Sequence, residues 1–243
     1  MSAWTTSTTA PSWEITQPDV DALRQPLIDL WQRNLPTAAK HRFEWLYGSG
    51  RAQGWLLGEP ASPASGAAGL MLRTIAIGGR PTDCGATIDL NVNESLRSGG
   101  PALALARAVT NAADREGREL LFGMPNRSAA AVLKRAGYRE LGAFSNWTKV
   151  LRTEPNLQRV LRSRFASRLL APVADKALHL ISFDWYAPVS KDWIAEPLSQ
   201  FDSRFDRLSS RAASQFDVVG ERTEDFLTWR FTKCPDRGCH IFG

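Results

Sequence analysis

"RSGGPALALARAV", residues 97–109, joins two different backbone patterns of this chain. It follows the alternating stretch "TIDLNV", residues 87–92, and places two glycines and a proline ahead of an unbroken run of helix formers. A tight turn explains these residues simply, since glycine adopts backbone angles that other residues resist and proline starts helices well. A more specific interpretation is an anion cradle, because the free N–H groups and the dipole at a helix start attract a pyrophosphate.

Strand and helix signals alternate on both sides of this stretch. The predicted helices cover residues 20–35, which Pro26 is expected to break or kink, then 38–48, 101–116 and 127–137. The predicted strands cover residues 13–16, 52–59, 66–78, 85–92 and 118–125, the last of them buried, and a final pair at 138–144 and 146–152. This order predicts an α/β fold with a mixed central sheet flanked by helices.

Length and composition limit the class of protein. The chain has 243 residues, of which 43% are hydrophobic, and this is enough for a sizeable core. No apolar run is long enough to cross a bilayer, and the first residues lack the basic start and apolar core of an export signal. We therefore expect a cytoplasmic protein.

The cysteines suggest neither a disulfide framework nor a metal site. There are three of them, Cys84, Cys234 and Cys239. The segment "CPDRGCH", residues 234–240, invites a metal interpretation, but no second cluster supplies the missing ligands at the spacing of structural zinc sites. We expect no metal.

Basic residues gather in one segment. The net charge is +5, and arginines alternate with apolar residues at helical spacing in "LQRVLRSRFASRLL", residues 157–170. This pattern predicts an amphipathic basic helix. It is either a connector with a solvated face or a peripheral contact to anionic lipid. No nucleic-acid-binding module accompanies the charge, so no nucleic acid partner is expected.

Two spaced motifs stand on either side of the strand predicted at 118–125. The first consists of Arg97, Gly100 and Ala102, and the second of Asn126, Ala129, Gly137 and Tyr138. In their order and spacing they resemble the motifs of the Gcn5-related N-acetyltransferases. That family's acyl-CoA loop has Arg or Gln, then Gly, then Gly or Ala, and its second signature places Asn ahead of Ala, Gly and an aromatic residue. The resemblance covers residues 13–151.

The resemblance implies an acyltransferase that uses acetyl-CoA or another acyl-CoA, bound where two central strands splay apart. The backbone near Val92 would pair with the pantetheine arm, and Asn126 would lie beside that arm. The loop amides would hold the pyrophosphate. The residues implied for this loop are Arg97, Ser98, Gly99, Gly100 and Ala102.

The chain departs from the family at two positions. Leu133 stands where members often carry a tyrosine that protonates the thiolate, and Pro101 removes one N–H from the cradle. A free amine has a pKa of about 10.4, so a group must accept its proton. The two candidates are Asp89 and Glu94. The alternative for Glu94 is a solvated surface carboxylate with no role in catalysis. By strand alternation, Asp89 should face opposite to Ile88, Leu90 and Val92, and a structural hydrogen-bonding role is its alternative.

The end of the chain resembles its beginning. Trp45 and Trp229 each precede an aromatic residue by two positions and a glycine by nine, and "ALHLISFDW", residues 177–185, is interpreted as the first strand of a second copy. A chance match is the alternative. We expect an acyltransferase-like domain at 13–151, a basic helical linker at 152–176 and an incomplete second unit at 177–243, a layout that resembles tandem proteins of bacterial polysaccharide biosynthesis.

Three functions are compatible with these features. The first is transfer of an acetyl or other acyl group to the amine of a small metabolite or an amino sugar, within polysaccharide biosynthesis. The second is aminoacyl transfer from charged tRNA, for which no basic groove is evident. The third is a degenerate, non-catalytic binding protein, which Leu133 favours and the intact glycine loop disfavours. The acceptor, the acyl chain length and the oligomeric state stay open.

Overall fold

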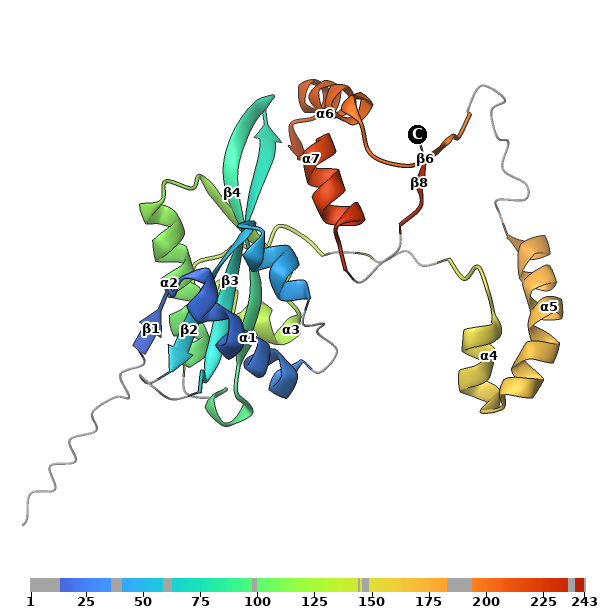
Figure 1. Cartoon of the computed structure of the whole chain (residues 1–243), viewed down its shortest axis with the longest axis horizontal. Helices are drawn as coiled ribbons and strands as arrows, with labels where there is room; N and C mark the ends of the chain where they lie inside the picture. The colour runs from blue at the N-terminus through green and yellow to red at the C-terminus, as the bar shows by residue number, and fades with distance from the viewer. Residues whose placement is uncertain are drawn as a thin grey trace, which may run out of the picture. The chain divides into compact units, whose positions relative to one another are not determined.

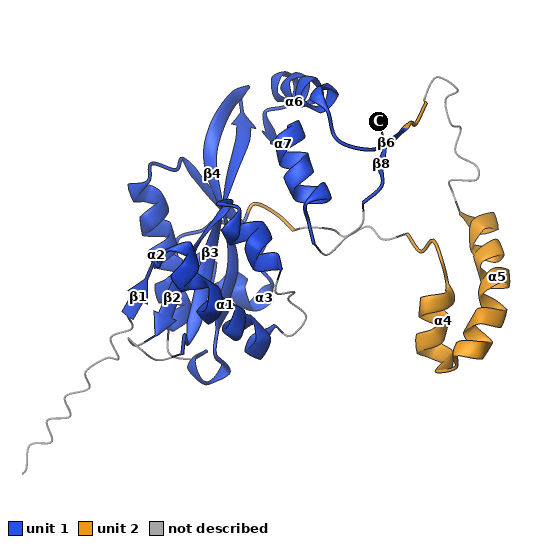
Figure 2. Ribbon diagram, in the orientation of Figure 1, with its two compact units in different colours: residues 1–140, 197–243 blue, residues 141–196 orange. Residues whose placement is uncertain are grey.

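The computed structural model describes residues 14–35, 41–58, 63–97, 100–143, 145, 149–182, 194–235 and 239–242. Ser98 and Gly99 of the expected cradle lie outside these residues. The chain divides into two compact units, residues 1–140 with 197–243, and residues 141–196 (Figure 2). The C-terminal segment therefore belongs to the same compact unit as the N-terminal part, whereas the sequence suggested separate ranges of 13–151, 152–176 and 177–243.

The first unit contains a mixed, six-stranded sheet with strand order β1-β2-β3-β4-β5, and β7 adds to β3. All neighbours pair antiparallel except β4 and β5, which are parallel. The predicted fold class, a mixed sheet flanked by helices, is confirmed. The strands are β1 (Glu14–Thr16), β2 (Ala52–Gly58), β3 (Gly66–Ile77), β4 (Arg80–Val92), β5 (Leu120–Gly123) and β7 (Val218–Gly220).

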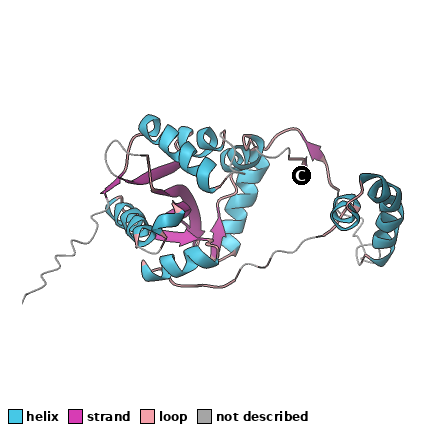
Figure 3. Cartoon of the chain, turned by 90° about the horizontal axis from the view of Figure 1, so that it is seen from below, coloured by secondary structure: helices cyan, strands magenta, loops and turns pink. Residues whose placement is uncertain are grey.

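Helices cover both faces of this sheet (Figure 3). On one face, α1 (Val20–Asn34) and the π-helical turn η1 (Glu44–Gly48) bury aromatic side chains that include Trp31 and Tyr47. On the other face, α2 (Pro101–Arg115) packs Leu105 and Val109 against the sheet. Burial of a leucine or valine such as these stabilises the fold by about 1.5–3 kcal/mol relative to its exposed state.

Local signals place the helix ends. The Asp19 carboxylate accepts a hydrogen bond from the Ala22 N–H at 2.8 Å and so caps α1, which continues through Pro26 without the expected break. Gly100, with a φ of 90°, precedes α2, and Gly117, with a φ of 72°, follows it. The predicted helix at 101–116 is therefore confirmed.

A long hairpin of β3 and β4 extends beyond the rest of the sheet (Figure 1). Gly78 and Gly79 form its turn with φ values of 56° and 78°, which glycine adopts without strain. β7 pairs with the end of β3 at Ile75–Ile77.

The first unit also contains shorter elements. They are η2 (Glu94–Leu96), α3 (Arg127–Arg135), β6 (Pro197–Leu198), α6 (Ser203–Gln215), α7 (Glu224–Leu227), the π-helical turn η4 (Thr228–Thr232) and β8 (Ile241–Phe242).

The predicted strand pair after α3 is wrong for the residues described. Residues 138–143 contain no strand, and residues 144 and 146–148 lie outside the description. β5 consequently has no strand on its outer edge among the described residues, which is why it is half-buried to exposed instead of buried as expected.

The second unit is a hairpin of two helices, α4 (Glu154–Leu161) and α5 (Arg164–Ile181). The single helix expected at 157–170 is wrong, because Arg162 adopts a φ of 51° and Ser163 caps a new helix by accepting a hydrogen bond from the Ala166 N–H. The strand expected at 177–185 is also wrong up to Ile181. Its residues continue α5, where alanine, lysine and leucine favour helix; residues 183–185 are not among those described.

Asp175 of α5 ties the two helices together. Its carboxylate accepts hydrogen bonds at 2.7 Å from both the hydroxyl and the backbone N–H of Thr153, at the start of α4. These bonds favour the charged form and hold the pKa of Asp175 below its ordinary value. No helix in the described part of the chain is long and apolar enough to cross a membrane.

Candidate functional site

The parallel pairing of β4 and β5 ends long before β4 does. The paired residues run from Cys84 and Leu120 to Thr87 and Gly123. β4 continues to Val92, where its other edge is still paired with β3. Among the described residues, the β4 edge beyond Thr87 has no strand partner. Its backbone N–H and C=O groups are therefore available to an extended ligand.

A β-bulge interrupts β4 in this unpaired part. Gly69 of β3 is opposite Ile88, but Ala67 is opposite Asn91, so β4 carries an extra residue. Asp89 takes the strained conformation, with a φ of 52°. The expectation that Asp89 faces opposite to Ile88 is wrong, because the bulge places both side chains on the same face of the sheet. Leu90 packs on the opposite face, as predicted.

Asp89 is buried and has two partners. Its carboxylate forms an ion pair with Arg42 at 2.9 Å, and the Tyr47 hydroxyl donates a hydrogen bond to the other oxygen at 2.8 Å. The Asp89 side chain is 5% exposed. Burial, followed by the charge of Asp89, raises the pKa of Tyr47 well above its ordinary value, so its hydroxyl stays protonated as a donor.

Glu94 lies in a different environment. It begins η2, its side chain is 89% exposed, and it forms an ion pair with Arg97 at 3.7 Å. Solvent screens such a pair strongly. Of the two carboxylates that the sequence suggested as proton acceptors, Asp89 is therefore the one that the fold positions with defined partners.

Amide side chains extend the polar face of β4 beyond Asp89. The Asn34 amide donates to Asn91 at 3.1 Å and to Asn93 at 3.3 Å. The Asn91 Nδ2 and the Trp31 Nε1 are both buried, and neither has a hydrogen-bond partner in the protein. An unsatisfied buried donor costs about 1–3 kcal/mol, so these two groups favour a small acceptor such as a water molecule beside them. The sequence analysis missed these three asparagines, although the alternation of Asp89, Asn91 and Asn93 was visible.

The first turn of α2 offers one end of the predicted anion cradle. Gly100 has no side-chain cap, and a Cβ placed on it would meet nothing within 4 Å, so open space surrounds it. Leu103 and Ala104 both donate to the Gly100 carbonyl. The Ala102 N–H precedes the first intrahelical bond and so has no acceptor within α2, whereas Pro101 has no N–H to offer.

Asn126, Leu133 and Tyr138 surround the end of β5. The Asn126 side chain caps α3 by accepting from the Ala129 N–H at 2.9 Å. Leu133 is buried beneath Gly123. The Tyr138 hydroxyl lies 2.7 Å from the Thr87 hydroxyl, at the last pair of β4 and β5. The half-buried ring of Tyr138 thus brings a hydroxyl to the point where the two strands separate.

A pocket of about 240 Å³ lies elsewhere in the same unit. β6, η4 and β8 line it, together with Cys239 and His240, and it contains none of the residues that the sequence analysis proposed for a site. The described residues contain no group of three or more His, Cys, Asp or Glu side chains arranged to hold a metal ion.

Comparisons with known proteins find similarity only among solved structures. No protein-family model matches the chain, and no curated protein matches it. Glucosamine-6-phosphate N-acetyltransferase from Arabidopsis thaliana is 9% identical, with a TM-score of 0.45 over 56% of this chain and 98% of that one. A GCN5-related N-acetyltransferase from Ralstonia eutropha is 15% identical, with a TM-score of 0.42 over 56% and 99% of the two chains.

A further solved structure, a predicted acetyltransferase with acetyl-CoA from Clostridium acetobutylicum, is 12% identical. Its TM-score is 0.44 over 57% of this chain and 96% of that one. Because these identities and TM-scores are low, the similarities assign neither a substrate nor an activity to this chain.

Proposed function

We propose that this chain is an acyl-CoA-dependent N-acyltransferase of the Gcn5-related type. The observation that carries the proposal is the unpaired edge of β4 beyond Thr87, which leads through η2 to the uncapped, glycine-led start of α2. An unpaired strand edge suits an extended arm with amide groups, and a helix N-terminus suits an anion. Coenzyme A combines such an arm with a diphosphate in one molecule.

The residues present fit this cofactor in part. Backbone groups from Ile88 to Val92 would pair with the pantetheine arm, and the Ala102 N–H and the space at Gly100 would receive the diphosphate. Arg97 is exposed beside this end of the site and adds positive charge. Asn126 would lie near the arm through its place after β5, although its side chain is already used as a cap. The cofactor would supply the acyl group as an activated thioester.

The proposed role of Asp89 is to accept a proton from the ammonium group of the acceptor, directly or through water, so that the neutral amine can attack the thioester. Arg42 and Tyr47 each use one lone pair of the carboxylate, and each oxygen keeps a second one. The same two partners fix the position of the carboxylate at the bulge. A positioned base raises a rate by about 10²–10⁴.

The polar face of β4 favours an uncharged, hydroxyl-rich part on the acceptor. The amides of Asn34, Asn91 and Asn93 both donate and accept hydrogen bonds, as hydroxyls do. A phosphate would need mainly donors and positive charge, but Arg42 is already paired with Asp89. We therefore propose an amino sugar or similar hydroxylated amine as acceptor, a chemistry compatible with polysaccharide biosynthesis.

Buried Leu133 supports a second candidate, a protein that binds the nucleotide without turnover. Leucine has no hydroxyl to protonate a departing thiolate. The Tyr138 hydroxyl, at the point where β4 and β5 separate, could protonate the thiolate in place of the missing tyrosine. Binding and turnover must therefore be measured separately.

Calorimetry with acetyl-CoA tests the proposal, with Gly100→Glu as the variant and Gly117→Glu as its matched control. Both glycines flank α2, both have positive φ, and a Cβ on either meets nothing within 4 Å, so both changes strain the backbone and add the same charge. We expect micromolar binding that Gly100→Glu abolishes and Gly117→Glu retains. Binding without thiol release against a panel of amines and amino sugars would support the second candidate. No binding at millimolar acetyl-CoA would overturn both.

A further inference from the structure

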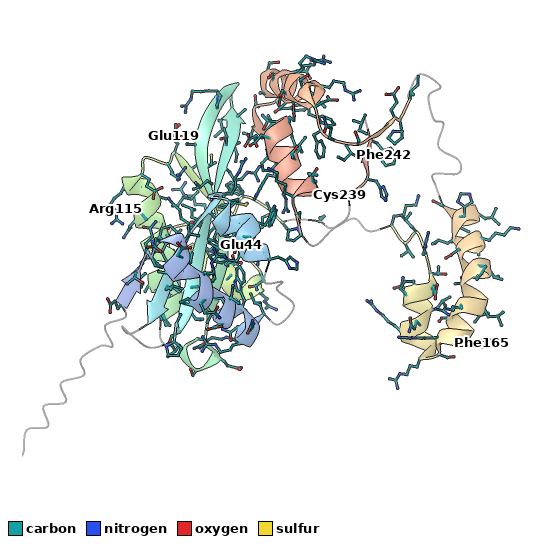
Figure 4. All side chains as sticks on the ribbon, in the orientation of Figure 1. Glu44, Arg115, Glu119, Phe165, Cys239 and Phe242 are labelled. Atoms are coloured by element: carbon teal, nitrogen blue, oxygen red, sulfur yellow. The ribbon has the colours of Figure 1, made fainter. Side chains whose placement is uncertain are left out.

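The helical hairpin of α4 and α5 leaves its large apolar side chains exposed. Within the described part of the hairpin only Ser167 and Ala171 are buried. Phe165, Leu169 and Val173 are 79%, 67% and 70% exposed, and Figure 4 labels the first of them. Their spacing of four residues places them on one face of α5. Val160 of α4 is exposed as well.

This arrangement reverses the usual order of burial, since small residues occupy the contact between the helices and large apolar ones face water. An exposed apolar stripe of this kind marks a surface that binds something. The hairpin forms a compact unit of its own, in which α4 and α5 lie side by side (Figure 1).

The charge of the hairpin indicates what it binds. Residues 152–182 carry six cationic side chains and two anionic ones, Glu154 and Asp175, so they hold four of the five excess positive charges of the chain. Arg164 and Arg168 directly precede Phe165 and Leu169 of the apolar stripe, and both arginines are exposed. The cationic residues are Arg152, Arg159, Arg162, Arg164, Arg168 and Lys176.

We propose that this hairpin docks the protein on an anionic lipid surface. A helix with aromatic and aliphatic residues on one face and arginines beside them lies in the plane of the membrane interface, with its apolar side chains among the acyl chains. The arginines then contact lipid phosphates. The contact is peripheral, and it does not depend on the acyltransferase function proposed above.

Co-sedimentation of the full chain with vesicles tests this docking. We expect binding to an equal mixture of phosphatidylcholine and phosphatidylglycerol that decreases with salt, and weak binding to phosphatidylcholine alone. Equal binding to both vesicle types, or binding to neither, would overturn the proposal.

Two pairs of variants separate the contributions of charge and apolar surface. Arg159→Gln with Arg164→Gln should weaken binding about thirtyfold, since each cationic residue strengthens it about fivefold. Arg107→Gln with Arg115→Gln removes the same charge from exposed positions of α2 and should leave binding within about twofold of the wild type. Equal losses in both pairs would mean that only net charge matters and would contradict docking through the hairpin.

For the apolar stripe, Phe165→Gln with Leu169→Gln should weaken vesicle binding by at least about tenfold, because two large apolar side chains then no longer bury their surface among the acyl chains. Leu208→Gln, at an exposed position of α6, serves as control. Glutamine keeps the helix propensity, and circular dichroism checks that the hairpin is folded. If the double variant instead converts a dimer to a monomer in light scattering while vesicle binding persists, the stripe is a protein interface and the proposal is wrong.

Discussion

Trp45 and Trp229 exchange the same hydrogen bond in both directions. The Trp45 indole N–H donates to the Trp229 carbonyl at 2.8 Å, and the Trp229 indole N–H donates to the Trp45 carbonyl at 2.9 Å. The two rings stack with their centroids 4.8 Å apart and their planes 13° from parallel. Residues 184 positions apart in the chain thus make equivalent contacts, as the two halves of a symmetric dimer would.

The surroundings of the two tryptophans repeat as well. Each lies in a π-helical turn, η1 or η4. An arginine also lies over each ring, Arg51 over Trp229 and Arg230 over Trp45, although the two arginines do not occupy corresponding positions. The order β1, α1, η1, β2 recurs as β6, α6, η4, β8, with β7 and α7 added between α6 and η4, and the two outer strands of each set pair antiparallel. We infer that the segment after residue 196 repeats the beginning of the chain.

The reciprocal pair predicts strong coupling between the two tryptophans. Trp45→Phe and Trp229→Phe should each lower the free energy of unfolding by about 1–3 kcal/mol, through the lost hydrogen bond and poorer stacking. The double variant should lose less than the sum, with a coupling of about 0.5–3 kcal/mol. Urea unfolding of the four proteins measures this cycle. Strict additivity would show that the two residues stabilise the fold independently.

The sequence predicts those parts of the fold that depend on local signals. Asp19 and Asn126 cap helices, and Pro101 and Gly117 bound α2, because each acts on backbone groups within four residues. The break at Arg162 was missed because the apolar spacing continues across it, although Ser163 is a good cap.

The site is less predictable because its contacts are not local. The alternation of apolar and polar residues gives no signal for the bulge that places Ile88 and Asp89 on the same face of the sheet. The contact between Tyr138 and Thr87 spans 51 residues, and that between Tyr47 and Asp89 spans 42. Only the folded sheet brings these pairs together.

Pro101 limits the proposed anion cradle by one N–H. Pro101→Ala restores that donor at the first position of α2 and should tighten acetyl-CoA binding about tenfold, since a hydrogen bond to a charged group contributes about 1.5–3 kcal/mol. Pro101 is buried, so unfolding experiments should accompany the calorimetry. Pro26→Ala, within α1, is the control and should leave the affinity unchanged. Equal affinity of Pro101→Ala and wild type would place the diphosphate away from this turn.

The two carboxylates of the site should differ in their effect on turnover. Asp89→Asn should reduce kcat by about 10²–10⁴ through loss of the base, with acetyl-CoA binding retained. It should also lower stability, because Arg42 loses its ion pair. Glu94→Gln, at an exposed position, should change the rate less than about tenfold. The reverse outcome would identify Glu94 as the base, and full activity of both variants would exclude both.

Tyr47 should make the stability of the fold depend on alkaline pH. Its pKa is raised in the folded protein, mainly by burial, whereas in the unfolded chain it has an ordinary value of about 10. The stabilisation is therefore complete below about pH 10 and is lost as the pH rises, because only the unfolded state then releases the proton. Compared with Tyr47→Phe, the wild type should lose about 1.4 kcal/mol more per pH unit above pH 10. Urea unfolding of both proteins at several pH values measures this difference, and the difference should be constant between about pH 7 and 9. A difference that stays constant up to about pH 12 would show that Tyr47 ionises equally in both states.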